Sequence, residues 1–198
     1  MRQERARQTR RALLDAAATE FDLYGYEGTT LARISRTAGV TLGALTFHFP
    51  SKAALADAVR SEGAALTGGG RPLDPGAGGL IDLLARLLDE EPSVRAAARL
   101  SWEQPESAGN WHTAWGPELR ERLARERAAV PGGVAPVLDE VDLETLAHCL
   151  VAGSVVLRRG VVPLGGEPAA PEEVRRRLRR LWQHAAAREP NRPSTPNI

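Results

Sequence analysis

The segment TLGALTFHFPSK, residues 41–52, places hydroxyl, imidazole and ammonium groups within a short apolar stretch. We expect a helix of about two turns here, which ends before Pro50 because proline disfavours helical backbone in the residue preceding it. Gly43 and Ala44 would let the backbone approach the floor of a DNA major groove, where hydroxyl and imidazole groups can donate hydrogen bonds to base edges or phosphates. The solvent face of this helix is predicted to carry Thr41, Leu42, Gly43, Thr46 and His48.

Lys52, the only lysine of the chain, falls in the first turn of the next predicted helix, which Ser51 can cap. A cation at this place opposes the helix dipole. A phosphate oxygen there would bind both the ammonium and the free backbone N–H groups of the turn. We therefore predict that Lys52 contacts DNA phosphate. For this residue taken alone, a solvated surface charge is the alternative.

Three capped helices are expected to position these groups. The first runs from about residue 3 to residue 24, ends at Gly25, and has one apolar face formed by Leu13, Ala16, Ala17, Phe21 and Tyr24. Thr29 and Thr30 can cap the second, Gly39 supplies the turn after it, and Thr41 can cap the third. A short helix, a glycine turn and another short helix form a helix-turn-helix motif. Its small shared core is expected from Leu31, Ile34, Ala38, Val40, Leu45 and Phe49.

Other charged and polar residues near the motif are candidate contacts to the DNA backbone. We expect Thr30 and Arg36 to reach phosphates, and we interpret Arg33 as a surface charge. The first eleven residues carry five arginines against one acid, Glu4. Two interpretations of that stretch stay open, an arm that enters the adjacent minor groove and a solvated, frayed terminus.

Composition narrows the class of protein. Of the 198 residues, 42% are hydrophobic and 26% are charged, and the net charge is +1. The single cysteine, Cys149, excludes an internal disulfide and a cysteine metal cluster within one chain. No stretch approaches the roughly eighteen apolar residues of a membrane span, and the N-terminus has no apolar signal core, so we expect a soluble cytoplasmic protein without a membrane partner. The common enzyme motifs are missing, and we expect no catalytic residue, cofactor or metal.

The remaining sequence also predicts helices, and hence an all-α fold, over about 79–90, 93–104, 112–129, 142–161 and 171–188. The glycine- and proline-rich segment 67–79 is predicted to be a loop. It would separate residues 1–66, the helix-turn-helix domain with its connecting helix, from a larger helical domain over residues 80–188. The polar, proline-rich residues 189–198 are predicted to be disordered.

Residues 9–59, TRRALLDAAATEFDLYGYEGTTLARISRTAGVTLGALTFHFPSKAALADAV, resemble the N-terminal domain of TetR-family transcriptional repressors. Within that family, GALTFHFPSKAALA is most similar to the γ-butyrolactone autoregulator receptors of actinomycetes and to their relatives that respond to furans, butenolides or antibiotics. The resemblance implies an all-helical homodimer with an N-terminal DNA-binding domain and a C-terminal domain that binds a small effector and dimerises. Beyond the first domain the resemblance is weaker, and it is best at DLETLAHCLVAGSVV.

Two residues depart from the family's TKGALYFHF pattern: Leu42 stands where lysine is common, and Thr46 stands where tyrosine is common. The resemblance implies that the tyrosine contacts phosphate and that the lysine adds a cationic contact. Each phosphate contact contributes to affinity and to its salt dependence. The departures therefore predict either weaker DNA binding or a different operator. Leu42 can instead pack on a thymine methyl.

All four tryptophans, Trp102, Trp111, Trp115 and Trp182, follow residue 100. Three of them, close to Gln104, suit a pocket for a mostly apolar ligand with a few polar atoms, and core packing is the alternative for each. The resemblance favours Trp115, because it precedes ELRERLARERAA much as the ligand-domain tryptophan of the receptors precedes a long charged helix. Trp111, Trp102 and Gln104 are the further candidates.

The last two predicted helices differ in character. The one over 142–161 is apolar on more than one face, which indicates burial or a surface shared with a partner subunit. The arginine-rich one over 171–188 has its apolar residues on one side, Val174, Leu178, Leu181, Trp182 and Ala185, and the arginines are interpreted as a solvated face partly paired with Glu172 and Glu173.

These observations together predict a ligand-responsive transcriptional repressor. It would bind double-stranded operator DNA as a homodimer and be released by a small diffusible molecule. The alternative is a ligand-binding protein of the same fold whose DNA binding is weak or altered.

Overall fold

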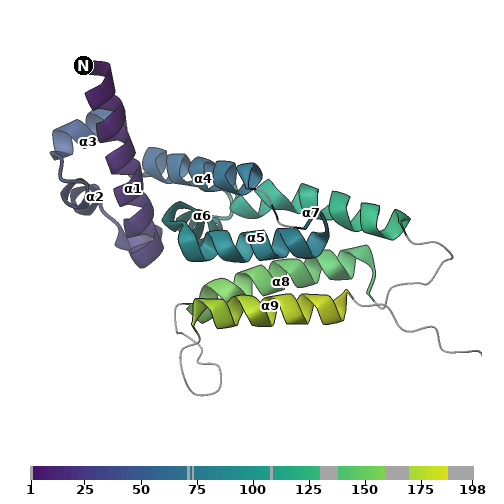
Figure 1. The fold of residues 1–198 in the computed structure, drawn as a ribbon. Coiled ribbons are helices and arrows are strands. Elements are labelled where there is room, and N and C mark those ends of the chain that lie inside the picture. The colour runs from purple at the N-terminus through teal and green to yellow at the C-terminus, as the bar shows by residue number, and fades with distance from the viewer. Residues whose placement is uncertain are drawn as a thin grey trace, which may run out of the picture. The chain divides into compact units, whose positions relative to one another are not determined.

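The computed structural model describes residues 2–70, 72, 74–107, 109–129, 138–158 and 170–186. These residues form helices and short turns without a strand, which confirms the predicted all-α fold (Figure 1). The predicted disordered tail, 189–198, lies outside the described residues. The helices are α1 (Arg2–Gly28), α2 (Leu31–Thr37), α3 (Leu42–His48), α4 (Lys52–Gly69), α5 (Ala77–Glu90), α6 (Pro92–Glu103), α7 (Trp111–Ala128), α8 (Glu140–Arg158) and α9 (Pro171–Ala185).

The helix ends predicted from capping residues are confirmed. The hydroxyl of Thr30 accepts a hydrogen bond from the Arg33 N–H at 3.2 Å, and the hydroxyls of Thr41 and Ser51 cap α3 and α4 in the same way. Gly39 has φ of 67° in the turn before α3. Gly25, with φ of 72°, interrupts α1, and one more turn follows it.

The segment 67–79 contains less loop than predicted. Helix α4 continues to Gly69, and α5 begins at Ala77. The end of α4 is anchored by Thr67, whose buried hydroxyl donates to the Gly63 carbonyl at 2.8 Å. The chain forms two compact units: the first contains residues 1–70 and 87–115, and the second contains residues 71–86 and 116–198. The division into domains at 67–79 stays a prediction.

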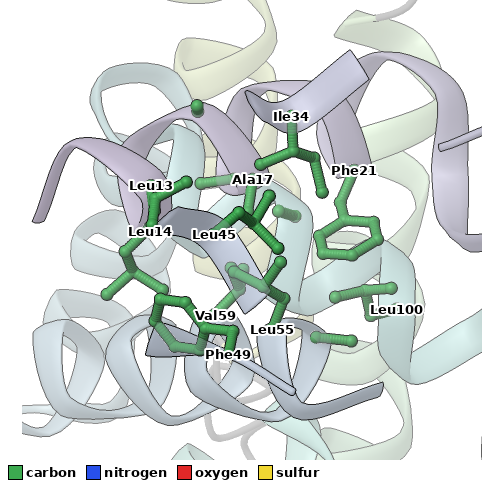
Figure 2. Close-up of a cluster of buried hydrophobic side chains, with 14 residues drawn as sticks. Leu13, Leu14, Ala17, Phe21, Ile34, Leu45, Phe49, Leu55, Val59 and Leu100 are labelled. Carbon is green, nitrogen blue, oxygen red and sulfur yellow. The ribbon is translucent and has the colours of Figure 1, made fainter. Parts of the chain in front are cut away.

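The core of the first unit is built from α1, α2, α3, α4 and α6. Figure 2 shows side chains from these helices pointing toward one another, among them Phe21, Ile34, Leu45, Leu55 and Leu100, and all five are fully buried. The predicted core of the helix-turn-helix motif is therefore confirmed. It consists of buried Ile34, Leu45 and Phe49 with partly buried Leu31, Ala38 and Val40 packed against them.

The C-terminal end of α1 differs from the prediction, whereas its start at Arg2 agrees with it. Tyr24 is exposed rather than part of the apolar face, because Gly25 breaks the helix immediately after it, and Tyr26 stacks on Phe21 instead. The arginine-rich stretch is the beginning of α1 rather than an arm that precedes it. One of these arginines, Arg11, pairs with Asp15 one turn later at 2.9 Å, which favours the helical conformation.

Helices α4 and α6 approach very closely at Gly63. A Cβ atom at this position would lie 2.5 Å from the Ala97 Cβ and 2.8 Å from the Ser93 carbonyl oxygen. No real Cβ makes contacts this short, so only glycine lets the two helix backbones pack at this distance.

In the second unit, α8 and α9 lie side by side (Figure 1). Val174 and Leu178 of α9 are buried with Ala85 of α5, and two leucines of α8 pack against them. Leu181 is exposed, so it does not belong to the buried apolar face predicted for α9. Val156 of α8 is also exposed, which is compatible with the prediction that this helix is apolar on more than one face. The arginines of α9 are mostly solvated, as expected; Arg176 and Arg177 pair with Glu173, and Arg179 pairs with Asp82.

Candidate nucleic-acid interface

The face of α3 that points away from the core presents most of the predicted contact residues. Thr41, Gly43 and Thr46 are exposed, and Ala44 and His48 are half-buried. Leu42 has 49% of its surface exposed, which is unusual for a large apolar side chain. Helix α3 has seven residues and packs one side against the core, where Leu45 is its one fully buried residue. Its other side is exposed or partly exposed.

Two threonine hydroxyls act as caps and keep a donor for a ligand. Thr30 and Thr41 accept hydrogen bonds from the backbone N–H groups of Arg33 and Ala44 at 3.2 and 3.1 Å. A hydroxyl that accepts in this way still has its O–H to donate, for example to a phosphate oxygen. Thr46 differs, because its hydroxyl donates to the Gly43 carbonyl within α3 at 3.1 Å.

Phe47 is absent from the predicted contacts, yet it is 83% exposed. Its ring meets the His48 ring edge to face, with 5.2 Å between the centroids. The sequence contains the signal for this exposure. Leu45 and Phe49 are four residues apart and both face the core, so residue 47, about 200° around the helix from Leu45, must face outward. An aromatic ring in this position adds an apolar contact surface to the face.

Gly43 has open space around it. A Cβ atom at this position would meet only the Thr41 hydroxyl oxygen, at 4.0 Å. The fold therefore does not require glycine at this position, in contrast to Gly63. A requirement for glycine would have to come from a molecule that approaches α3 from outside.

Lys52 is held by the chain itself. Its Nζ donates to the carbonyl oxygens of Tyr26 and Thr29 at 2.9 and 3.2 Å, and it lies 4.2 Å from the centre of the Tyr26 ring. These carbonyls lie after the kink of α1, at its C-terminal end. Lys52 belongs to the first turn of α4, and its ammonium donates to these carbonyls of the preceding segment. An ammonium has three N–H donors, and two carbonyls leave one for a phosphate.

Arg33 lies at the surface, as interpreted, but its charge is paired. Its Nε donates to the carboxylate of Glu20 at 2.9 Å, and its guanidinium lies 3.7 Å from the centre of the Tyr24 ring. The hydrogen bond to Glu20 is the largest cause that raises the Arg33 pKa. Arg36, one turn later, is exposed at the end of α2, where a cation is favoured by the helix dipole.

The residues predicted to bind a ligand are placed differently from one another. Trp111 and Trp115 are fully buried, with ring centroids 6.0 Å apart, whereas Trp102 is 55% exposed. The Trp111 Nε1 donates to the Thr67 hydroxyl at 2.8 Å, which links α7 to the end of α4. Gln104 accepts a hydrogen bond from Arg60, a charged residue of α4 that is only 2% exposed.

Two pockets of about 350 and 310 Å³ lie between α5 and α9 and share Asp74, Gly79, Asp82 and Arg179. Neither is lined by Trp115, Trp111, Trp102 or Gln104.

Among the described residues, no group of histidine, cysteine and carboxylate side chains could hold a metal ion. Within the same ranges, every helix is too short or too polar to cross a membrane.

Known proteins share both the sequence and the fold. Residues 13–59 match the family described as bacterial regulatory proteins, tetR family. The A-factor receptor protein of Streptomyces griseus is 34% identical over 194 residues, which cover 92% of this chain and 64% of the receptor's length. The structure of CprB from Streptomyces coelicolor in complex with its biological operator sequence is 34% identical with a TM-score of 0.67, and 94% of this chain and 91% of that one are covered.

A third relative is a γ-butyrolactone receptor described as an ArpA-like protein. It is 31% identical with a TM-score of 0.60, and the match covers 89% of this chain and 99% of that one. These relatives are regulators and receptors rather than enzymes, in agreement with the expectation that this chain is not an enzyme. The likeness over nearly whole chains extends the match of the N-terminal segment, and the chain belongs to the TetR family of bacterial regulatory proteins.

Proposed function

We propose that the chain is a transcriptional repressor that binds operator DNA through the outward face of α3 and releases it when a small molecule binds. The outward face of α3 carries the proposal. It combines exposed Leu42, Phe47 and Thr46 with the open space at Gly43, and the core does not use it. A mobility-shift assay with the promoter next to the chain's own gene tests the proposal. The absence of a retarded complex would contradict it.

Gly43→Ala is expected to have opposite effects on stability and on DNA binding. Alanine has a higher helix propensity than glycine by about 1 kcal/mol, and the Cβ has space, so the free energy of unfolding should rise by up to that amount. The same methyl would separate α3 from the bases, and operator affinity should fall roughly tenfold. Urea unfolding and DNA titration measure the two effects. An unchanged affinity would mean that the DNA does not approach Gly43.

Lys52→Met removes the ammonium and keeps a side chain of similar length. We expect affinity to fall for all DNA sequences, and the dependence of log K on log salt to weaken by roughly one unit, because one phosphate contact is lost. The carbonyls of Tyr26 and Thr29 also lose their donor, which should lower the free energy of unfolding by about 1–3 kcal/mol. Titrations at several salt concentrations and urea unfolding measure both. An unchanged salt slope would show that Lys52 holds the motif together without contacting phosphate.

We propose that the effector binds beside Trp115 and acts through α4. Two contacts within the first unit support this proposal: Trp111 donates to Thr67, and Arg60 donates to Gln104. Each joins a residue between Gln104 and Trp111 to α4, the helix that begins at Lys52. A ligand that displaces the aromatic rings would therefore shift α4, and it must bind that shifted state better than the DNA-binding one.

Trp115→Phe is the informative change at this site. Because Trp115 is fully buried, alanine would leave a cavity, whereas phenylalanine keeps an aromatic ring and loses the N–H. If the Trp115 N–H donates to the effector, its loss removes a hydrogen bond of about 1 kcal/mol. Release of DNA should then need a roughly fivefold higher effector concentration. Trp102→Phe, on an exposed tryptophan, is the control. If Trp115→Phe releases DNA at the wild-type effector concentration, the effector binds elsewhere.

A homodimer is proposed through α8. Its outward side carries a stripe of uncharged residues, Val141, Thr145, Cys149, Ala152 and Val156. Val141 and Val156 are exposed apolar residues at the two ends of this stripe. Exposed apolar surface of this kind favours contact with another protein, and an identical stripe on a second copy is self-complementary. Sedimentation of the purified chain measures the oligomeric state.

The alternative, a receptor-like protein with weak or altered DNA binding, is supported by Thr46. Its hydroxyl donates within α3, and Leu42 offers no charge to a phosphate. If the wild-type chain binds its own promoter weakly, variants with Leu42→Lys and Thr46→Tyr separate the two readings. Tighter binding would mean that these positions have lost phosphate contacts, and abolished binding would mean that the present residues recognise the operator.

A further inference from the structure

Glu20 is a buried carboxylate in the DNA-binding part of the chain. It lies on α1 and is only 6% exposed. It stands next to the buried Phe21 and five residues before the kink at Gly25. Carboxylates are rarely buried unless several donors surround them. The donors around Glu20 all come from α2 or from the turn before it.

Three contacts tie Glu20 to the whole length of α2. Its Oε1 accepts from the Thr37 hydroxyl at 2.6 Å, at the last residue of α2. Its Oε2 accepts from the Arg33 Nε at 2.9 Å, in the middle of the helix. Its backbone carbonyl accepts from the buried hydroxyl of Thr29 at 3.0 Å, just before the N-cap. One residue of α1 therefore holds the beginning, the middle and the end of α2.

Helix α2 needs an external hold of this kind. It has seven residues, too few for a helix to be stable by itself. Ile34 is the fully buried apolar side chain of α2, and Leu31 packs against the same core while only partly buried. Apolar contacts are not directional, so these two side chains alone leave the rotation of so short a helix loosely defined. The hydrogen bonds that Arg33 and Thr37 donate to the Glu20 carboxylate are directional, and they fix the rotation of α2. Since α3 follows after one short turn, the orientation of α2 sets the orientation of α3.

The carboxylate is ionised under ordinary conditions. Its burial opposes ionisation and is the largest single influence, but hydrogen bonds from Thr37 and Arg33 and the charges of Arg33 and Arg36 outweigh it, so that the Glu20 pKa is lowered from its usual value. The hydrogen bonds are therefore charge-assisted and stronger than neutral ones.

We propose that Glu20 is a positioning residue for operator recognition: from the interior of the protein it fixes α2, and thereby the angle at which α3 meets DNA. This inference rests on the proposed DNA binding. It predicts that the loss of Glu20 weakens specific binding more than it weakens the fold. Glu20 itself does not contact DNA.

Glu20→Leu tests the proposal, because leucine fills a similar volume and removes both acceptors. Arg33 and Thr37 are partly or fully exposed and can bond to water instead, so we expect the melting temperature to stay within a few degrees of the wild-type value. Affinity for the promoter duplex that the wild type retards should fall at least tenfold, and affinity for a scrambled duplex should not fall. The loss of the negative charge alone would raise the affinity for DNA, because it removes an anion beside the phosphates. A fall in affinity therefore cannot come from the charge.

Glu27→Gln, on an exposed carboxylate of the same helix, is the matched control for charge, and we expect it to bind the promoter as well as the wild type or better. Thr37→Val should lower specific affinity in the same direction as Glu20→Leu, and the double variant should be no weaker than Glu20→Leu alone. That non-additivity would show that the two residues act through one contact.

Hydrogen exchange gives a result that does not depend on DNA. In Glu20→Leu, the backbone amides of α2 should exchange faster, and those of α4 should be unchanged. The proposal is overturned by wild-type exchange in α2, by wild-type specificity for the promoter, or by an affinity loss that a lower melting temperature explains in full. If the wild-type chain retards no promoter DNA, the proposed function fails instead, and the exchange result still decides the role of Glu20 in holding α2.

Discussion

Replacing Trp111 by alanine is expected to lower the free energy of unfolding by about 3–5 kcal/mol. The side chain is fully buried, its ring packs against Trp115, and its Nε1 donates to the Thr67 hydroxyl at 2.8 Å. Alanine would leave a cavity and would remove the donor that Thr67 faces at the end of α4. Urea unfolding followed by far-UV circular dichroism measures the change.

Trp102→Ala is the matched control for this prediction, since it removes the same side chain from an exposed position nine residues away. It should change the free energy of unfolding by less than about 1 kcal/mol. Similar losses in the two variants would contradict the packing described here. A stable Trp111→Ala protein that no longer responds to effector would instead make Trp111 a ligand contact, as the sequence suggested.

Leu42→Glu is expected to weaken operator binding at least roughly a hundredfold, which corresponds to about 2.7 kcal/mol. Leu42 stands at the start of α3 with half of its surface exposed, so glutamate fits the fold and places a negative charge on the face that would meet phosphates. Acidic residues are also favoured in the first turn of a helix, so stability should not fall. Titration with the promoter duplex at two salt concentrations measures the loss.

Leu42→Gln separates charge from shape, because glutamine has the size of glutamate without its charge. We expect it to bind at least tenfold more tightly than Leu42→Glu, and the difference should shrink in high salt. If both variants bind like the wild type, α3 does not face DNA. If both lose binding equally, the leucine makes an apolar contact, such as one with a thymine methyl, that neither residue can replace.

The features that the sequence predicts well depend on residues close together in the chain. Thr30, Thr41 and Ser51 cap helices through hydrogen bonds to N–H groups three residues later, and a pattern of this length is visible in the sequence. The small core of the motif follows from apolar spacing in the same way. Helices α5 to α9 begin and end close to where periodicity placed them.

The features that the sequence did not predict depend on partners far away in the chain. The donors of Glu20 lie up to seventeen residues away on another helix, and the carbonyls that hold Lys52 lie 23 and 26 residues before it. Tyr24 has the spacing of a core residue, but the kink at Gly25, where φ is positive, interrupts the helix immediately after it. For the tryptophans, spacing cannot separate a core position from a ligand contact, because both are apolar surroundings with one donor to satisfy.

Lys52 is the only lysine in the chain. A peptidase that cleaves only after lysine has a single target in this chain, the bond between Lys52 and Ala53. In the folded protein that bond lies in the first turn of α4, and the lysine is engaged by two carbonyls, so the cut requires local opening. One cut separates the helix-turn-helix segment from the rest of the sequence. The rate of cleavage therefore reports, without any label, how often this junction opens, and a ligand that tightens or loosens the junction will slow or speed the cut.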